Sequence, residues 1–402
     1  MKCRSCSKQN FISILDLGKQ PWCNDFLTKD QCGKENFYPL HLRYCKNCEL
    51  LQIDHTVPKE TMFLDHKYVS GTTKTLQKHF FDLAKENVEQ FNLKDGDLIV
   101  DIGGNDGTQL LQYKKLGINN VLNVESATSI AKISETNNIP VVNKFFNENT
   151  VEQYIGENCV KLINAAGVFF HLEELHSVVR GIKKSLQNDG VFIIQFMYAG
   201  KMVDNLNFDT IYHEHLCYYT IQSLSNLLKT YGLEIFDAKE AQIHSGSIIA
   251  KVCHSDSSLN KKTARFKTIF QEDKKYTLES FVGFGNKIRN QRNNLKNFLK
   301  ELKVTNKTIY AYGAPAKGNT LLNYFGIGNE LIDKAVEVNE MKVGYYLPQS
   351  HIPITLESKQ DFPDYYLLLS HNFASEIIQK NQDIIQRGTK FIIPFPKIQI
   401  VG

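Results

Sequence analysis

The ten-residue stretch Leu98-Ile-Val-Asp-Ile-Gly-Gly-Asn-Asp-Gly107 decides the fold class of this chain. An apolar run ends in an acidic residue and a glycine-rich turn, and a segment with a helical pattern, residues 108–113, follows directly. This order predicts a buried strand, a tight turn and a helix start, which is where open α/β sheets hold nucleotide-like ligands. Glycine lets the backbone approach a ligand that a Cβ atom would push away.

The residues around this turn favour one cofactor over another. A nicotinamide dinucleotide fingerprint would need glycine at position 102, where Ile102 stands. About twenty residues on, an expected strand ends in Glu125, whose carboxylate can accept hydrogen bonds from ribose hydroxyls. With Asp101, this pattern favours S-adenosylmethionine; the alternative is a tight turn with a solvated glutamate. The segment 68–72 is polar and aromatic and could cover the ligand. The residues expected to contact the cofactor are Tyr68, Ser70, Asp101, Gly103, Asn105, Asp106 and Glu125.

Length and composition exclude several classes of protein. A chain of 402 residues usually divides into two or three domains. A net charge of +4 without a Lys/Arg block does not indicate nucleic acid as a partner. We expect no membrane segment, because no apolar run approaches the roughly 18 residues of a span, and the first residues lack the apolar core of a signal peptide. The nine cysteines are odd in number and mostly free-standing, which predicts reduced thiols and a cytoplasmic protein.

Two Cys-x-x-Cys pairs, Cys3-Arg-Ser-Cys6 and Cys45-Lys-Asn-Cys48, predict a zinc site near the N-terminus. Each pair can fold two sulfurs onto one ion, and four thiolates complete a tetrahedron at about 2.3 Å. Because four thiolates leave no open position for a substrate, we expect the metal to hold a small subdomain together. The alternative, two unrelated cysteine pairs, is disfavoured by the doubled motif.

Strand and helix patterns alternate along the rest of the chain. Two late strands at 235–238 and 247–253 leave no room for a long helix, so an antiparallel edge should finish a mostly parallel sheet. Long polar helices at about 260–303 should bridge to a second doubly wound sheet. The fold class is therefore α/β, with two Rossmann-like sheets. The other expected strands are at 98–102, 121–125, 140–142, 161–165, 191–196, 308–312, 332–338, 365–369 and 391–393.

Two further segments carry candidate chemistry. Phe208–Tyr219 holds two histidines, a glutamate, an aspartate and three tyrosines, which suits proton transfer; the alternative is a polar surface turn. His213 and His215 are equally able to take a proton, and in an extended segment their side chains would share a face. In the segment 313–320, small residues and Lys317 precede an expected helix, which favours an anion site over a plain turn with an exposed lysine.

Five motifs occur together and in order: the cysteine pairs, Val100–Thr108, Phe208–His215, His244-Ser-Gly-Ser247 and Tyr312–Asn323. The set resembles the deoxysugar C-methyltransferases, which act on nucleotide-linked keto sugars. The resemblance covers nearly the whole chain. It implies a zinc-binding domain at 1–65, a class I methyltransferase domain at 66–255, and a C-terminal α/β domain at 256–402 that helps to hold the sugar nucleotide.

The resemblance also implies site residues. In that family the second histidine of Tyr-His-Glu-His is the catalytic base, which corresponds to His215; Tyr212, Glu214 and His171 would orient the base or an enolate oxygen. The implied substrate is a nucleotide-diphosphate keto sugar. The residues expected to contact it are His244, Ser247, Tyr312, Lys317, Gly318, Asn319 and His351.

The chain departs from the family pattern in places. Ala165-Ala-Gly-Val168 stands where Ala-Asn-Asn-Val is usual, and Ser370-His-Asn372 stands where Trp-Asn is more usual, so the substrate can differ from that of antibiotic-sugar members. Two other interpretations stay open. The first is an O-methyltransferase in which His215 deprotonates a hydroxyl. The second is a catalytically altered, zinc-stabilised nucleotide-sugar-binding protein, which the altered segment 165–167 keeps open. We expect a monomer or a weak dimer.

Overall fold

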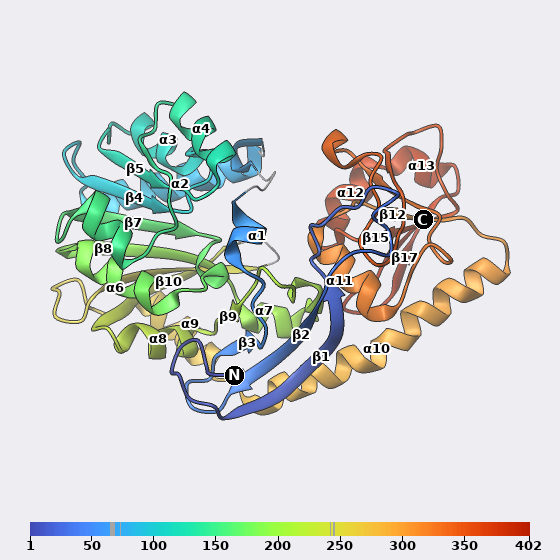
Figure 1. Ribbon diagram of the computed structural model, residues 1–402, viewed down its shortest axis with the longest axis horizontal. Coiled ribbons are helices and arrows are strands. Elements are labelled where there is room, and N and C mark those ends of the chain that lie inside the picture. The colour runs from blue at the N-terminus through green and yellow to red at the C-terminus, as the bar shows by residue number, and fades with distance from the viewer. Residues whose placement is uncertain (65–68, 73, 242, 244–245) are drawn as a thin grey trace.

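The computed structural model describes residues 1–402 except 65–68, 73, 242 and 244–245 (Figure 1). The predicted cofactor contact Tyr68 and the predicted substrate contact His244 therefore lie outside the described residues. The described chain forms an N-terminal domain, a central domain around a seven-stranded sheet and a C-terminal domain around a six-stranded sheet. In Figure 1 the two large sheets lie on opposite sides of the molecule, and the N-terminal strands run between them.

The N-terminal sheet has the order β1-β2-β3-β9, and its pairs are antiparallel. Three of its strands come from the first residues of the chain, whereas β9 directly follows the histidine-containing segment 208–215. The cysteine-rich part is therefore hydrogen-bonded to the segment that carries the candidate base. The strands are β1 (Phe11–Pro21), β2 (Phe37–Cys45), β3 (Leu51–Ile53) and β9 (Cys217–Tyr218), followed along the chain after β3 by helix α1 (Lys59–Phe63).

The central sheet has the order β10-β11-β8-β7-β4-β5-β6. Its strands from β8 to β6 are parallel, and β11 and β10 add the antiparallel edge that the short late connection predicted. The strands are β4 (Leu98–Ile102), β5 (Val121–Val124), β6 (Val141–Val142), β7 (Val160–Ala166), β8 (Leu186–Met197), β10 (Leu233–Ala241) and β11 (Ser247–His254). The helices are α2 (Lys74–Phe91), α3 (Thr108–Lys115), α4 (Thr128–Thr136), α5 (Glu148–Thr150), α6 (Leu175–Ser185), α7 (Ala199–Asp204) and α8 (Ile221–Lys229), with the short turns η1 (Ser70–Thr72), η2 (Val151–Ile155), η3 (Phe169–His171) and η4 (Phe208–Thr210).

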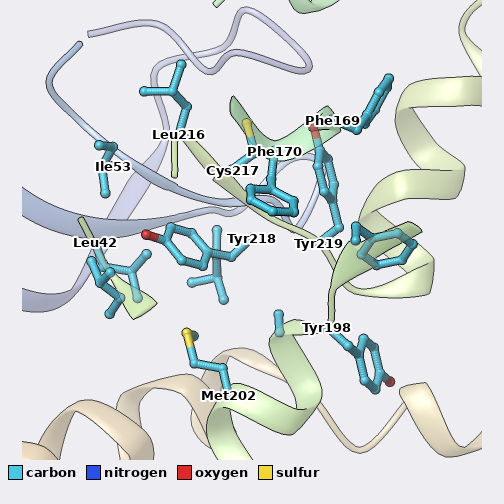
Figure 2. Packing of buried hydrophobic residues seen from close by; sticks show 14 of the residues in the cluster. Leu42, Ile53, Phe169, Phe170, Tyr198, Met202, Leu216, Cys217, Tyr218 and Tyr219 are labelled. Atoms are coloured by element: carbon cyan, nitrogen blue, oxygen red, sulfur yellow. The ribbon is translucent and has the colours of Figure 1, made fainter. Parts of the chain in front are cut away.

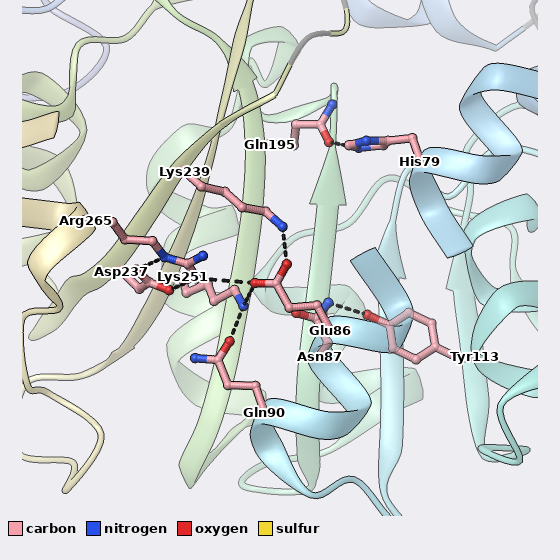
Figure 3. Close-up of polar contacts among 10 residues, drawn as sticks. All are labelled: His79, Glu86, Asn87, Gln90, Tyr113, Gln195, Asp237, Lys239, Lys251 and Arg265. Carbon is pink, nitrogen blue, oxygen red and sulfur yellow. Dashed lines mark hydrogen bonds and ion pairs between the residues drawn. The ribbon is translucent and has the colours of Figure 1, made fainter. Parts of the chain in front are cut away.

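Helix α2 is anchored on this sheet by polar contacts as well as by its apolar stripe (Figure 3). Glu86 forms ion pairs with Lys239 and with Lys251, and the Lys251 side chain is only 1% exposed. The burial of Lys251 lowers its pKa, and Glu86 partly offsets that effect. Nearer the start of the helix, His79 lies 2.8 Å from the Gln195 side chain on β8. These contacts hold the helix that follows η1, the turn that covers the glycine-rich loop.

A buried aromatic cluster lies between the N-terminal and central domains (Figure 2). Phe169, Phe170 and Tyr219 pack together with side chains from β2 and β3, and each is at most 5% exposed. Burying so much aromatic surface is a large stabilising contribution, on the order of 1.5–3 kcal/mol for each fully buried side chain. The cluster flanks the histidine-containing segment on both sides in sequence, so it fixes that segment to two domains.

The C-terminal sheet has the order β14-β13-β12-β15-β16-β17, parallel except for β17. The long helix α10 leads to it from the central domain and packs on β1 and α11 (Figure 1). The predicted strands are present, whereas the edge strands β14 and β17 were not predicted. The strands are β12 (Ile309–Tyr312), β13 (Lys334–Glu337), β14 (Ile354–Leu356), β15 (Tyr365–Leu368), β16 (Lys390–Ile393) and β17 (Gln399–Val401). The helices and turns are α9 (Ala264–Asp273), α10 (Leu278–Val304), α11 (Ala316–Phe325), α12 (Ala374–Lys380), α13 (Gln382–Gln386), η5 (Glu340–Lys342) and η6 (His371–Phe373).

Among the described residues, none of the helices combines the length and the apolar character that crossing a bilayer requires.

Candidate functional site

The four predicted zinc ligands converge. The Sγ atoms of Cys3, Cys6, Cys45 and Cys48 all lie within 4.8 Å of one another. The Cys3–Cys48 and Cys6–Cys45 sulfurs are each 3.5 Å apart, and none of these cysteines is in a disulfide. A tetrahedron with bonds of about 2.3 Å has edges of about 3.8 Å, so four thiolates at these separations fit one zinc ion. Gln52 donates a hydrogen bond to the Cys3 sulfur at 3.0 Å and thereby orients it.

The glycine-rich loop at the carboxyl end of β4 packs closely against the ends of the neighbouring strands. Gly103 has a φ of +62°, and a Cβ added there would lie 2.7 Å from the side chain of Val168. Glu125, 4% exposed at the end of β5, accepts hydrogen bonds from the Asn105 and Ala127 amides at 3.0 and 2.8 Å. The predicted cofactor contacts Gly103, Asn105 and Glu125 are therefore brought together at one edge of the sheet.

A second carboxyl group, that of Asp101 on β4, lies at this edge of the sheet. Asp101 is 2% exposed, and its pKa is raised well above the ordinary value by burial and by the neighbouring Glu125. Two buried carboxyl groups beside a glycine-rich turn suit a ligand that carries hydrogen-bond donors. S-adenosylmethionine carries them in its ribose hydroxyls and its amino group, so the residues present fit this cofactor.

Turn η1, which lies in the segment 68–72 that the sequence suggested could cover the ligand, contacts the glycine-rich loop. The amide of Ser70 donates to the Asn105 side chain at 2.9 Å, and the amide of Gly71 donates to Asp106 at 2.9 Å. A Cβ on Gly71 would lie 2.4 Å from an Asp106 oxygen, so a larger residue there would displace the Asp106 side chain. Two more of the predicted cofactor contacts, Ser70 in η1 and Asp106 in the loop, thus lie close together.

The candidate base His215 is held in one tautomer. Its Nδ1 lies 2.7 Å from the carbonyl oxygen of Thr210, which can only accept a hydrogen bond. Nδ1 therefore carries the proton, and Nε2 carries the lone pair that a base needs. The imidazole is 4% exposed; the ring of Tyr212 lies over it at 3.8 Å between centroids, and that of Phe170 meets it edge-on at 4.8 Å.

The two histidines of the segment do not share a face, because the chain turns between them rather than running extended. His213 is 0% exposed and lies against the N-terminal domain, with Nε2 3.2 Å from the Pro39 carbonyl and its ring beside Tyr38. Burial lowers its pKa to about 4. The expectation of a shared face is wrong, and the two imidazoles lie in different surroundings, which the pattern alone did not indicate.

The other predicted catalytic residues surround His215. His171 has its ring 5.0 Å from that of His215 and its Nδ1 2.6 Å from the Glu214 carbonyl. The Glu214 carboxylate accepts hydrogen bonds from Trp22 and Asn24 at 2.6 Å each, while burial raises its pKa. Burial, followed by the charge of Glu214, also raises the pKa of Tyr212 well above its ordinary value, which keeps its hydroxyl protonated.

The first turn of α11 reaches this site from the C-terminal domain. Asn319, fully buried, donates a hydrogen bond to the Cys23 carbonyl at 2.6 Å. Lys317 is hydrogen-bonded to the Asn372 side chain, and burial lowers its pKa while Asp209 raises it. Gly318 packs against Leu369, where a Cβ would lie 2.8 Å from the leucine side chain. The three residues thus lie where the N-terminal, central and C-terminal domains meet.

The remaining predicted substrate contacts are engaged elsewhere. Tyr312 is hydrogen-bonded to Glu357 and accepts one hydrogen bond from Asn381 at 3.0 Å, within the C-terminal domain. The Nε2 of His351 lies 2.8 Å from Glu35 of the N-terminal domain. The Ser247 hydroxyl donates to the Ile243 carbonyl at 3.0 Å. Their role as substrate contacts stays a prediction.

Residues that position the site were missed from the sequence. Thr210 holds His215 through its backbone, and Trp22 and Asn24 hold Glu214. The only signal for Trp22 was that it is the single tryptophan of the chain. A backbone carbonyl leaves no mark in the side-chain pattern, so Thr210 could not have been found that way.

Three family models match consecutive parts of the chain. They are a zinc binding domain at residues 3–63, a "Methyltransferase domain" at 76–238 and a "C-methyltransferase C-terminal domain" at 242–396. The chain is also 28% identical over 410 residues to the C-methyltransferase NovU of Streptomyces niveus, which covers 100% of this chain and 97% of that protein. These matches identify the chain as an S-adenosylmethionine-dependent C-methyltransferase with a zinc-binding N-terminal domain.

Solved structures similar to part of this C-methyltransferase include two bacterial enzymes. One is an S-adenosylmethionine-dependent methyltransferase from Aquifex aeolicus, with 17% identity, 46% of this chain and 98% of that chain covered, and a TM-score of 0.35. The other is from Clostridium acetobutylicum, with 15% identity, 44% and 92% covered, and a TM-score of 0.36. The family matches confirm the predicted α/β fold class, the cofactor S-adenosylmethionine and the zinc-binding N-terminal domain.

Proposed function

We propose that this C-methyltransferase methylates a carbon next to the ketone of a nucleotide-diphosphate keto-deoxysugar, with His215 as the base. The observation that carries the proposal is the bond from Nδ1 of His215 to the Thr210 carbonyl, which puts the ring proton on Nδ1 and the lone pair on Nε2. The base is close to the cofactor loop through a chain of neighbours. Val168 lies against Gly103, and three residues later His171 lies beside His215.

The ketone is required by the strength of the base. The C–H of an ordinary sugar carbon is far too weakly acidic for an imidazole to remove its proton. An adjacent carbonyl spreads the negative charge onto oxygen as an enolate, which brings the acidity within reach of a positioned base. When bound, S-adenosylmethionine supplies the electrophilic sulfonium methyl that the carbanionic carbon takes up. Asp101, Gly103, Asn105 and Glu125 would hold it.

The neighbours of His215 support the remaining steps. Tyr212, whose hydroxyl stays protonated, can donate a hydrogen bond to the enolate oxygen. Glu214 and His171 fix the turn on either side of the base through the Trp22, Asn24 and Glu214-carbonyl contacts. Holding base and reacting carbon in a fixed geometry can supply a large share of the rate acceleration.

The C-terminal domain would bind the nucleotide diphosphate. The first turn of α11, which carries Lys317, offers the positive end of the helix dipole to an anion. The hydrogen bond of Asn319 to Cys23 and the interaction of Lys317 with Asp209 support an anion site near the base. In this proposal the predicted domains at 1–65, 66–255 and 256–402 bind zinc, the methyl donor and the nucleotide diphosphate, respectively.

The test is incubation with S-adenosylmethionine and a panel of keto-deoxysugars linked to thymidine, uridine, guanosine or cytidine diphosphate. We expect one of them to gain 14 mass units, the mass of one methylene, with the new methyl on carbon by NMR. A methyl on oxygen would replace the proposal with the O-methyl alternative. Turnover of none of the panel, while the cofactor binds, would contradict the proposed substrate class.

A further inference from the structure

The segment that carries the base is attached to the C-terminal domain by the two residues before Thr210. The ring of Phe208 stacks on Phe325 of α11, at 5.1 Å between centroids and 17° between planes, and meets Phe395 edge-on at 5.4 Å. The next residue, Asp209, lies 2.8 Å from Nε2 of His371 in η6. Three consecutive residues therefore link the C-terminal domain to the carbonyl that orients His215.

Asp209 depends on the C-terminal domain for its charge compensation. Its side chain is 0% exposed, and within the described part of the chain its Oδ1 has no hydrogen-bond partner. Burial raises the pKa of this carboxyl, but His371 and, more weakly, Lys317 outweigh that effect, and the pKa lies below its ordinary value. Both groups come from the C-terminal domain, so separation of the domains would remove both positively polarised partners of this carboxylate.

The same pair stabilises the position of the base. Asp209 and Thr210 are both in η4, and Tyr218 donates a further, longer hydrogen bond to the Thr210 carbonyl at 3.4 Å. A rearrangement of Asp209 would move the adjoining carbonyl away from Nδ1 of His215. A displacement of about 1 Å in a catalytic group can cost about 100-fold in rate.

We propose that Asp209 is a positioning residue for the base, and that its hydrogen bond with His371 couples docking of the C-terminal domain to the orientation of His215. The inference rests on the proposed function of His215. The C-terminal domain then contributes to the proton transfer itself as well as to holding the nucleotide.

The first measurement needs no substrate. We expect the ¹⁵N signals of the His215 ring in the full-length protein to report the Nδ1–H tautomer, and to report a mixture of tautomers in Asp209→Asn and in His371→Leu. His371→Gln, which keeps a donor, should retain the wild-type signals. Asp273→Asn is the matched control, because Asp273 is a 3% exposed carboxylate of α9 that accepts from Tyr198, Ile221 and Gln222, outside η4. It should lower the melting temperature and leave the His215 signals unchanged.

The second measurement is kcat with the keto-sugar nucleotide that the panel identifies. Asp209→Asn and His371→Leu should each lose about 10- to 100-fold in kcat, with unchanged affinity for S-adenosylmethionine; if one variant does not fold, the other carries the test. Wild-type tautomer and kcat in the folded variants, beside an inactive His215→Asn, would overturn this inference and leave the proposed base intact. An active His215→Asn enzyme would overturn both.

Discussion

Nδ1 of His215 lies 2.7 Å from the carbonyl oxygen of Thr210, five residues earlier in the same segment. A carbonyl accepts and never donates, so this one bond assigns the ring proton to Nδ1 and the lone pair to Nε2. His213 has the opposite arrangement: its Nε2 faces the Pro39 carbonyl. The difference between the two histidines is therefore one of ring orientation and of the domain that each contacts.

Zinc should hold the N-terminal domain together. We expect one zinc per chain, and we expect Cys45→Ser to lower the melting temperature by at least about 5 °C, because metal binding contributes folding free energy. Cys32→Ser is the matched control, a half-buried cysteine of the same domain outside the cluster. Metal analysis without stoichiometric zinc, or equal melting temperatures for the two variants, would contradict the assignment.

Glu125 should contribute to cofactor binding. Glu125→Ala removes an acceptor and also frees the Asn105 and Ala127 amides that it holds. Calorimetry should show affinity for S-adenosylmethionine weakened by about 1–3 kcal/mol, the cost of losing a hydrogen bond to a charged group. Glu135→Ala, an exposed acid on α4, should bind like the wild type. Tight binding of NADH by the wild type would refute the cofactor site.

Lys317 should bind the diphosphate. Lys317→Ala should weaken the binding of thymidine or uridine diphosphate about 10-fold or more, with no change for S-adenosylmethionine. Lys300→Ala, at an exposed position of α10, serves as the control for loss of one positive charge. If calorimetry shows that both ligands lose affinity together, Lys317 has a structural role, which its hydrogen bond with Asn372 would explain.

The buried imidazole of His213 should make the free energy of unfolding depend on pH. Its pKa is about 4 in the folded chain, below the ordinary value near 6.5, so between these values the unfolded chain binds a proton that the folded chain does not. Stability is therefore lost as the pH falls from about 6.5 toward 4. From pH 7 to pH 5 the wild type should lose about 2 kcal/mol more than His213→Gln in urea unfolding. Equal losses would contradict the buried, neutral imidazole.

The fold was predictable where local patterns carry it. The strand, turn and helix at 98–115 follow from an apolar run and from glycines at positions that need them, and the antiparallel edge follows from a connection too short for a helix. The two Cys-x-x-Cys pairs likewise carry their chemistry in their spacing. In each case the decisive contacts are local in sequence, or they join cysteine pairs whose spacing is typical of a zinc site.

The rest of the site depends on contacts between distant segments. Strand β9 completes the N-terminal sheet from about 170 residues away, and its two residues carry no strand pattern. His371 and Asp209 are 162 residues apart in sequence. The turn that separates His213 from His215 arises from packing against Tyr38 and Phe170. Such pairings are set by tertiary packing, which residue spacing does not encode.

The most direct test of the central claim is solvent exchange at the sugar carbon. With the keto-sugar nucleotide in D₂O and S-adenosylhomocysteine in place of the methyl donor, the wild type should incorporate deuterium next to the ketone. In this assay His213→Asn should keep measurable deuterium exchange, and with S-adenosylmethionine it should keep measurable methyl transfer. His215→Asn should lose both by at least about 10²–10⁴-fold while it still binds the cofactor. A His215→Asn enzyme that exchanges and methylates at wild-type rates would contradict the mechanism.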